Sequence, residues 1–309
     1  MTAPAESVLR SGVGWLHHNL EWFDPQRWER FLPRRRFPAS PLLELVVLLR
    51  CLRRGPFAEL AGALVEAGLD LAERVTRRAE FREGLHRADL TFPYYAYLVC
   101  VLAEAGRDTR SLRDSVRSIV ETNIGDVTCA DRPAPTLMEL RYVLDVGSIA
   151  CPLPTLGELY PSSIVAARDT PLFFGDDDAY AVTHVLFYLT DFGVRPLPVD
   201  PAERERVREL VLIMLAGYLA RGNLDLAGEL MLCAETLGAH QHDLLDHGWR
   251  LMAGARRADG AVPSPLHDPA IVPAVQGEKR AAYLFGTCFH TTMVAAMAAS
   301  ERRRRALAE

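Results

Sequence analysis

Apolar residues are concentrated in six segments of the chain, and each segment has a neighbour in which apolar and polar residues follow helical spacing. A segment that is apolar around most of its circumference is typical of a buried helix, whereas an amphipathic one has a solvent-facing side. Few segments show the alternation of a β-strand. The six apolar segments are residues 41–54, 92–105, 136–149, 178–192, 224–238 and 280–301.

This regular alternation predicts an all-α protein built from helical repeats. The apolar segments recur about every 40–55 residues, within the range of helical repeats. Six inner and six outer helices make an (α/α)6 toroid-like barrel, which we expect to form a single domain over residues 1–309. An open helical solenoid is the alternative, although the polar stripes described next favour a shared centre. Further helices are expected at residues 5–31, 57–79, 108–122, 158–168, 201–221 and 241–258.

The fourth apolar segment carries a line of polar side chains. Four of its residues are spaced i, i+4, i+8 and i+11 and therefore share one face of a helix. They are Tyr180, His184, Tyr188 and Asp191. Since unpaired polar groups are costly to bury, we expect this face to border a polar cavity at the centre of the domain.

The last apolar segment carries a comparable polar face, and an acidic residue and an aromatic pair occur in two others. Glu139 lies in the third apolar segment, and Tyr94 and Tyr97 lie in the second. Tyr94, Tyr97, Tyr180, Tyr283 and Thr291 are therefore candidate substrate-binding residues. The residues that share the face in the last segment are Tyr283, Thr287, His290 and Thr291.

Composition and charge exclude several classes of protein. The chain has 309 residues, of which 49% are hydrophobic, with a net charge of −5 and a pI near 6.0. This balance gives no electrostatic drive toward nucleic acid or anionic membranes. There is no run of about 18 apolar residues and no signal-peptide pattern. We therefore expect a cytoplasmic protein whose partner is a peptide or a small molecule, with no nucleic acid or membrane partner, in an undetermined oligomeric state.

One short basic run interrupts this balance. Arg34, Arg35 and Arg36 follow one another directly after Pro33, in a predicted loop. Nucleic-acid binding would require a broader basic face. The run is therefore interpreted as a solvated surface patch.

Residues 250–299 contain a unit of helix, Asp-Gly turn, loop and helix. Its characteristic residues are Arg257-Ala-Asp259-Gly260, a proline-rich loop, Tyr283, and the stretch His290-Thr-Thr-Met-Val-Ala-Ala. The unit resembles the α/α-toroid superfamily of terpene cyclases, prenyltransferase β subunits and lanthionine cyclases. This resemblance implies the toroid fold, at the level of repeat architecture.

The reaction of these families does not transfer, because their motifs are altered or missing. Asp176-Asp177-Asp178 is only a loose analogue of the acidic D-x-D-D motif of terpene cyclases. Cys288-Phe289-His290 differs from the C-H-G zinc motif of lanthionine cyclases, and the D-x-C zinc pair of prenyltransferases is missing.

If the inner helices enter the barrel in parallel, His184, Cys233 and His290 lie in one layer. One interpretation is a zinc site with these three ligands and an open position for water. A second is a metal-free acid/base site, with His184 or His290 moving protons and Tyr188, Asp191 and Glu139 orienting them. Structural histidines in a buried core are a third.

We expect an intracellular cyclase-like enzyme of natural-product biosynthesis, acting on a modified peptide in the favoured case. Resemblance to lanthionine cyclases would imply addition of a thiol to a dehydroamino acid, with His184 and His290 as base and acid. One alternative is a terpenoid or polyketide cyclase that uses its aromatic lining to stabilise cationic or apolar intermediates. Another is a non-enzymatic protein that binds a peptide.

Overall fold

The computed structural model describes residues 3–167 and 174–307, which form fifteen α-helices and no β-strand. The all-α prediction is therefore confirmed for the described residues. The helices are α1 (Ala3–His18), α2 (Pro25–Phe31), α3 (Ser40–Arg53), α4 (Ala58–Thr76), α5 (Ala79–His86), α6 (Phe92–Glu104), α7 (Arg110–Thr122), α8 (Ala134–Val146), α9 (Leu156–Leu159), α10 (Asp176–Thr190), α11 (Pro201–Ala220), α12 (Leu224–Thr236), α13 (Asp243–Ala255), α14 (Gly277–Gly286) and α15 (Phe289–Ala306).

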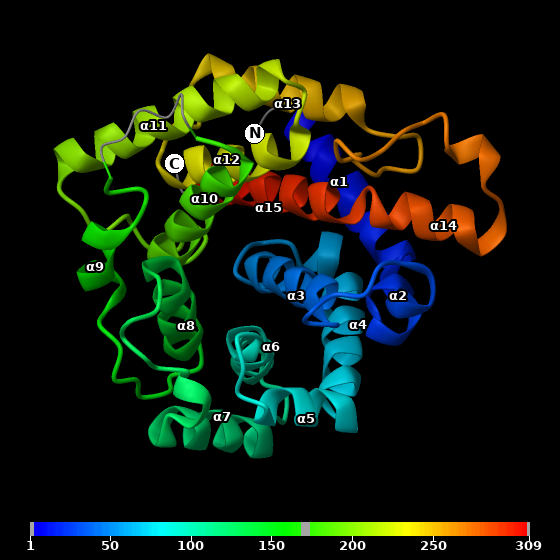
Figure 1. Ribbon diagram of the computed structural model, residues 1–309. Helices are drawn as coiled ribbons and strands as arrows, with labels where there is room; N and C mark the ends of the chain where they lie inside the picture. The colour runs from blue at the N-terminus through cyan, green and yellow to red at the C-terminus, as the bar shows by residue number, and fades with distance from the viewer. Residues whose placement is uncertain (1–2, 168–173, 308–309) are drawn as a thin grey trace.

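Six helices pack one after another around the middle of the molecule (Figure 1). Each contacts the next one in chain order, and the last contacts the first, so the contacts form a closed circuit. We call this set the inner circuit. It consists of α3, α6, α8, α10, α12 and α15. The first five agree with the predicted apolar segments to within about three residues at each end, which is the usual uncertainty of helix boundaries.

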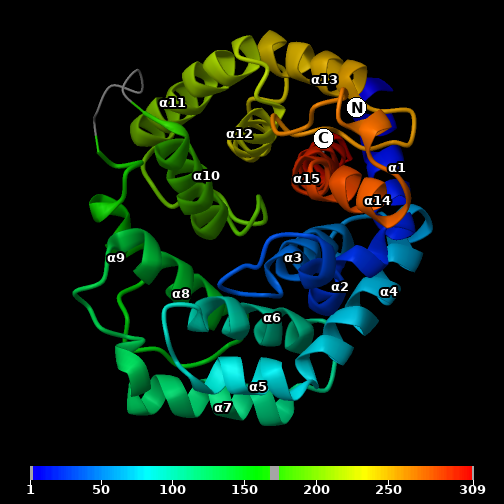
Figure 2. The same ribbon diagram turned by 45° about the vertical axis from the view of Figure 1, so that its right-hand side comes forward.

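The other helices lie mainly outside the inner circuit (Figure 2). Helix α1 packs against α15, α13 and α4, while α11 and α13 cover α12. The long amphipathic segment predicted at 57–79 is divided between α4 and the start of α5. The segment predicted at 158–168 is only the end of α9 and a 3-10 turn at Tyr160–Ser162, and its last residue lies outside the described residues.

Inner and outer helices differ in how much of their surface is buried. All thirteen residues of α12 are buried, including Asp225 and Glu229. In α7, by contrast, the buried residues are Leu112, Val116, Ile119 and Val120, which fall at i, i+4, i+7 and i+8 on one face. A helix buried on all sides has to direct its polar side chains toward partners or an internal cavity, because unpaired polar groups are costly to bury.

The segment at residues 280–301 is not one helix, as the sequence predicted, but two helices with their axes bent by 44°. The backbone carbonyl of Thr287 accepts a hydrogen bond from the amide of Ser264 at 2.9 Å. In a continuous helix that carbonyl would accept from Thr291 instead. The loop around Ser264 thus occupies the helical hydrogen-bond site at the break between α14 and α15. As a consequence, Tyr283 on α14 does not share a helix with His290.

Within the described ranges, no single helix is long and apolar enough to cross a membrane. The pair α14 and α15 meets the length and composition criteria only when the two helices are taken together across their bend.

Candidate functional site

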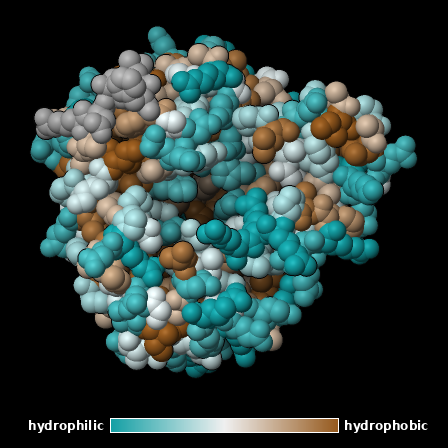
Figure 3. All heavy atoms as spheres, in the orientation of Figure 1, coloured by the Kyte–Doolittle hydropathy of each residue, from teal (hydrophilic) through white to brown (hydrophobic). Residues whose placement is uncertain are grey.

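A cavity of about 460 Å³ lies among the helices of the inner circuit. In the space-filling view, a hollow with an apolar floor opens near the middle of the molecule between hydrophilic residues (Figure 3). The cavity wall combines aromatic, apolar and ionisable side chains from all six inner helices and from the segment that connects α2 to α3. It is formed by Arg35, Arg36, Phe37, Ser40, Leu43, Glu44, Val47, Tyr94, Tyr97, Glu139, His184, Phe187, Tyr188, Phe192, Glu229, His290, Met293, Val294 and Met297.

His290, near the start of α15, is surrounded by carboxyl groups from two other helices. Its Nδ1 lies 2.9 Å from Oδ1 of Asp225, and its Nε2 lies 3.7 Å from Glu229 and 4.0 Å from Glu44. Burial alone would lower the pKa of His290, but the hydrogen bond to Asp225 and the charge of Glu44 outweigh it and raise this pKa to about 10. His290 is therefore a cation at neutral pH.

The carboxyl groups around His290 are not equivalent. Asp225 accepts hydrogen bonds from His290, Thr291 and Tyr180, and these contacts overcome the effect of burial and hold its pKa at about 2. Burial raises the pKa of Glu229 to about 7 even though the Thr183 hydroxyl donates to it. The site thus combines a permanently ionised carboxylate with one that exchanges protons near neutral pH.

Glu44 on α3 is the third carboxyl group of this cluster. Its pKa is raised, chiefly because it is surrounded by protein, and its Oε2 atom is buried without a hydrogen-bond partner. The apolar run around Glu44 could have marked this position in the sequence. An acidic residue in an otherwise buried helix is rare, because burying an unpaired charge is costly, and it therefore indicates a functional or structural role.

His184 on α10 lines the cavity, where part of its surface is accessible to solvent. Its ring lies close to those of Tyr180, Phe187 and Tyr188, at centroid distances of 6.4, 6.0 and 6.1 Å. Although the ring is exposed to the cavity, the protein packed around it and the positive charge of His290 lower the pKa of His184 to about 4. The two histidines of the cavity consequently differ in charge at neutral pH: His184 is neutral and His290 is a cation.

Glu139 on α8 provides a further ionisable group in the cavity wall. Burial raises its pKa to about 7, and the hydroxyl of Tyr188 donates to Oε1 of Glu139 at 3.0 Å. Tyr188 in turn stacks on Tyr142 with a centroid distance of 5.1 Å. This packing fixes the Tyr188 hydroxyl and, through it, the orientation of the Glu139 carboxyl group.

Asp191 shares the sequence spacing of His184 and Tyr188 but occupies a different environment. Helix α10 ends at Thr190, and Asp191 is its C-cap with a left-handed backbone at φ 49°. Its carboxylate accepts hydrogen bonds from Arg50 at 2.6 Å, Tyr142 at 2.7 Å and Arg54 at 2.9 Å. These contacts outweigh burial and hold the pKa of Asp191 at about 2. Its position is that of an internal ion pair beside the cavity, and not part of the described cavity wall.

The predicted substrate-binding residues separate into three groups. Tyr94 and Tyr97 on α6 line the cavity. Tyr180 and Thr291 lie behind the wall, where their hydroxyls donate to Asp225. Tyr283 lies elsewhere, because the break before α15 separates it from His290, and its hydroxyl bonds to the backbone of Asp268.

Cys233 does not point into the cavity. It is fully buried on α12, and its Sγ lies 3.9 Å from the backbone oxygen of Thr183. Among the described residues, no group of three or more His, Cys, Asp or Glu side chains is arranged to hold a metal ion. His184, Cys233 and His290, the three ligands of the zinc interpretation, do not form such a group.

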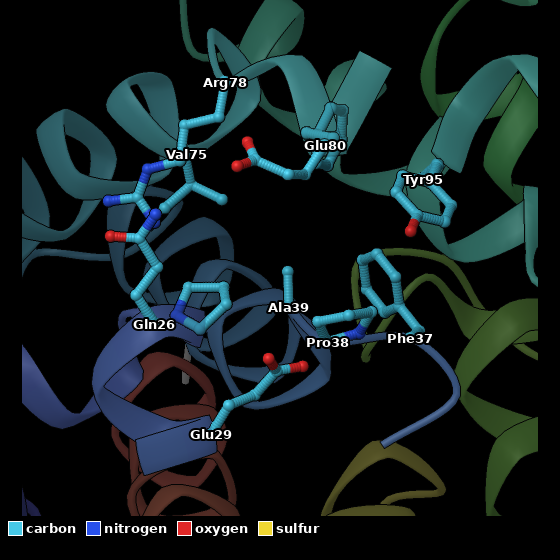
Figure 4. A pocket seen from close by; sticks show the side chains of 11 residues that line it. Gln26, Glu29, Phe37, Pro38, Ala39, Val75, Arg78, Glu80 and Tyr95 are labelled. Carbon is cyan, nitrogen blue, oxygen red and sulfur yellow. The ribbon is translucent and has the colours of Figure 1, made fainter. Parts of the chain in front are cut away.

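A second, smaller cavity of about 190 Å³ adjoins the first on the other side of Phe37 (Figure 4). Phe37 packs on Tyr94, which lines the larger cavity, and on Tyr95, which lines the smaller one. Arg78, on the opposite side in Figure 4, is paired with Asp24 at 2.6 Å. Glu29 and Glu80, which carry the carboxyl groups of this smaller cavity, are exposed to solvent. The smaller cavity therefore offers fewer enclosed ionisable groups than the larger one.

A model of the family described as "Domain of unknown function (DUF6895)" matches residues 9–300. The chain belongs to that family, and the match includes every residue that lines the larger cavity. No curated protein and no solved structure matches the chain.

Proposed function

We propose that this protein is an α/α toroid whose central cavity is the active site of a metal-independent ring-forming enzyme. The closed circuit of six helices, with further helices outside, supports the toroid. The observation that carries the enzymatic proposal is that ionisable groups in one cavity have widely different pKa values. Glu139 exchanges its proton near pH 7, whereas His290 stays protonated to about pH 10. Groups whose pKa values are pushed apart in this way are typical of acid/base sites.

The two groups lie on opposite sides of the cavity. Glu139 belongs to α8 and His290 to α15, and these helices are three positions apart in the circuit of six. A substrate that fills the cavity can therefore contact the base with one side and the acid with the other. His184, which the sequence favoured as the base, is less suited to that role because a pKa of about 4 makes it weakly basic. We assign it to contacts with the substrate.

The favoured reaction is addition of a cysteine thiol to a dehydroamino acid in a modified peptide. The Glu139 carboxylate accepts the thiol proton while the sulfur forms a bond to the β-carbon of the alkene. The alkene electron pair moves to the α-carbon and its carbonyl, and the resulting enolate takes a proton from His290. Water in the cavity then returns the proton from Glu139 to His290. The ring-closed product is an isomer of its precursor, so no co-reactant is needed.

The aromatic wall favours one other candidate function. The rings of Tyr94, Tyr97 and Phe187 present π-faces that stabilise positive charge. A cyclase acting on a terpenoid or polyketide would use these faces for cationic or apolar intermediates, and it would not require Glu139 to change its protonation state.

A model peptide that contains one dehydroalanine and one cysteine tests the favoured function. Ring closure leaves the mass unchanged but removes the free thiol, so labelling with N-ethylmaleimide followed by mass spectrometry reports the rate. We expect the wild type and Arg110→Gln, an exposed control on α7, to close the ring. Glu139→Gln and His290→Gln should be slower by roughly 100-fold, the typical contribution of a general acid or base.

The pH profile adds an independent criterion. The rate should rise as Glu139 ionises near pH 7 and fall as His290 loses its proton near pH 10. Ring closure at the rate in buffer alone, or unchanged rates in both variants, would refute this function. Peptide binding without conversion would identify a binding protein instead.

A further inference from the structure

The segment between α2 and α3 places two arginines at the cavity. Arg35 and Arg36 both belong to the cavity wall, and both are exposed to solvent. From the sequence, this basic run was interpreted as a solvated surface patch. The structure shows that the run borders the cavity of the inner circuit, the one lined by Glu139, Glu229 and His290.

Arg35 is held in position by contacts that leave most of its donors available. Its guanidinium lies over the ring of Trp28 at 4.7 Å and near that of Phe289 at 5.6 Å. Its Nη1 donates to the Ser40 hydroxyl at 3.2 Å. Stacking of this kind orients the planar guanidinium, whose remaining N–H groups match the oxygen atoms of a carboxylate or phosphate.

The carboxyl group of Glu44 does not accept a hydrogen bond from Arg35. Oε1 of Glu44 lies 3.9 Å from Nη1 of Arg35, beyond hydrogen-bond distance. For Arg36, the structure shows neither a hydrogen bond nor an ion pair with any described residue. Two adjacent guanidinium groups therefore reach the cavity with unused donors.

Deeper in the cavity the wall is mainly acidic and apolar, because the cation there, His290, is already paired with Asp225. The carboxyl groups of Glu139 and Glu229 disfavour an anion deeper in the cavity, while Val47, Met293 and Met297 offer apolar contacts. A ligand with one anionic end and one apolar end would thus be oriented, with its charge at the arginines and its apolar part inside.

We propose that Arg35 and Arg36 form an anion-binding subsite at the cavity mouth, and that the natural substrate carries a carboxylate or phosphate group next to an apolar portion. The subsite deepens the proposed function, since it rests on the same cavity being the place where the substrate binds. It does not depend on which bond is formed there.

A pair of fluorescent probes tests the subsite without a substrate. 1-Anilinonaphthalene-8-sulfonate carries an anionic sulfonate, whereas N-phenyl-1-naphthylamine has the same aromatic body and no charge. We expect the double variant Arg35→Gln/Arg36→Gln to bind the anionic probe roughly tenfold more weakly, because charge-assisted hydrogen bonds are lost. Binding of the neutral probe should change less than twofold.

Three controls make the result specific. Arg110→Gln/Arg117→Gln removes two exposed arginines of α7 and should leave both affinities unchanged. Val47→Trp fills the cavity and should weaken both probes. The affinity of the anionic probe should fall with added salt in the wild type and much less in the Arg35/Arg36 variant.

Competition separates an amphiphilic ligand from a simple anion. Octyl phosphate should displace the anionic probe at concentrations at least about tenfold lower than inorganic phosphate does. Equal potency, equal loss of both probes in the arginine variant, or no loss of either would overturn the proposal. Thermal melts of each variant confirm that the folded protein is being measured. Since no reaction is followed, failure of the ring-closure assay and failure of this subsite are distinguishable.

Discussion

The carboxylates of Asp191 and Asp225 lie in two buried clusters that differ in how completely charge is paired. Around Asp191, the side chains of Arg50 and Arg54 offset two carboxylates, its own and that of Glu104. The cation that contacts Asp225 among the described residues is His290, which also lies within 4.0 Å of Glu44 and Glu229.

This difference shows how a buried ion-pair cluster that stabilises the fold can be distinguished from a reactive site made of similar residues. Both aspartates have a pKa of about 2, so that value alone does not separate them. The useful criterion is whether the ionisable groups next to each aspartate have a partner of opposite charge. Glu229, with a pKa of about 7, shares the cation His290 with Asp225 and faces the cavity, whereas the charges around Asp191 are balanced within their own cluster.

The largest effect on stability is expected from Arg50→Ala. Arg50 is almost fully buried and donates to Asp191, Glu104 and Tyr142, so its removal leaves a buried carboxylate without its main partner. We expect the free energy of unfolding to fall by about 3–5 kcal/mol. Urea denaturation measures this loss, with Arg110→Ala on the exposed face of α7 as a control. A loss as small as that of the control would mean that the ion-pair cluster around Asp191 does not stabilise the fold.

A smaller, pH-dependent loss is expected from His290→Gln. The pKa of His290 is about 10 in the folded protein and about 6.5 in an unfolded chain. A raised pKa stabilises the fold fully below pH 6.5, and the contribution disappears as the pH rises through 10. At pH 6 the variant should lose about 1.5–3 kcal/mol, the value of a hydrogen bond to a charged group.

The test of His290 is the difference between wild-type and variant stability across pH. Urea denaturation at intervals from pH 6 to pH 10 should show this difference shrinking as the pH rises. A difference that stays constant over the whole range would mean that His290 is not the cation of the cluster.

Glu139→Gln should raise the free energy of unfolding, whereas His290→Gln lowers it. Burial raises the pKa of Glu139 from 4.5 to about 7, so the wild type loses stability as the pH rises from about 4.5 through 7. Glutamine avoids burying this charge and still accepts a hydrogen bond from Tyr188. We expect a gain of about 1 kcal/mol at pH 8 together with loss of ring closure, a trade-off typical of active sites. Thermal melts at pH 5 and pH 8 reveal it, and equal effects at both values would contradict the assigned pKa.

The smallest effect on stability is expected from His184→Ala. Because His184 borders a cavity that water can enter, truncating it should cost no more than about 1 kcal/mol. Substrate or probe binding should nevertheless weaken, since the ring forms part of the wall. Thermal melts of this variant and His184→Asn, run beside the binding assay, measure both. A large drop in melting temperature with binding intact would identify a structural histidine.

Much of the architecture could be read from the sequence, because local patterns determine it. The apolar character of the inner helices and the spacing of His184 and Tyr188 were sufficient to place both residues on one face of α10. The same periodicity failed at Asp191, where the chain leaves the helix with a left-handed residue. It also failed at Tyr283, where the amide of Ser264 interrupts the helix from outside.

The partners of the ionisable residues could not be predicted from a single sequence. Arg50 meets Asp191 across 141 positions, and His290 meets Asp225 across 65. Helical spacing indicates which side chains share a face but carries no information on which distant helix lies opposite. The role of Arg35 was missed for the same reason, since only the fold brings its loop to the cavity.

The contact between α3 and α15 has a consequence for how the molecule acquires its cavity. These helices lie near opposite ends of the described chain, yet they are neighbours in the inner circuit. Bringing them together is a long-range step of assembly, like the packing of α1 on α15. Such steps slow folding, because the entropy of loop closure is lost before the stabilising contacts form. During synthesis, helices α3 to α12 emerge from the ribosome before His290 does, so Asp225 and Glu229 precede the cation that they contact. Until α15 docks, Asp225 and Glu229 remain open to water, and a binding-competent cavity arises only in the final stage of folding.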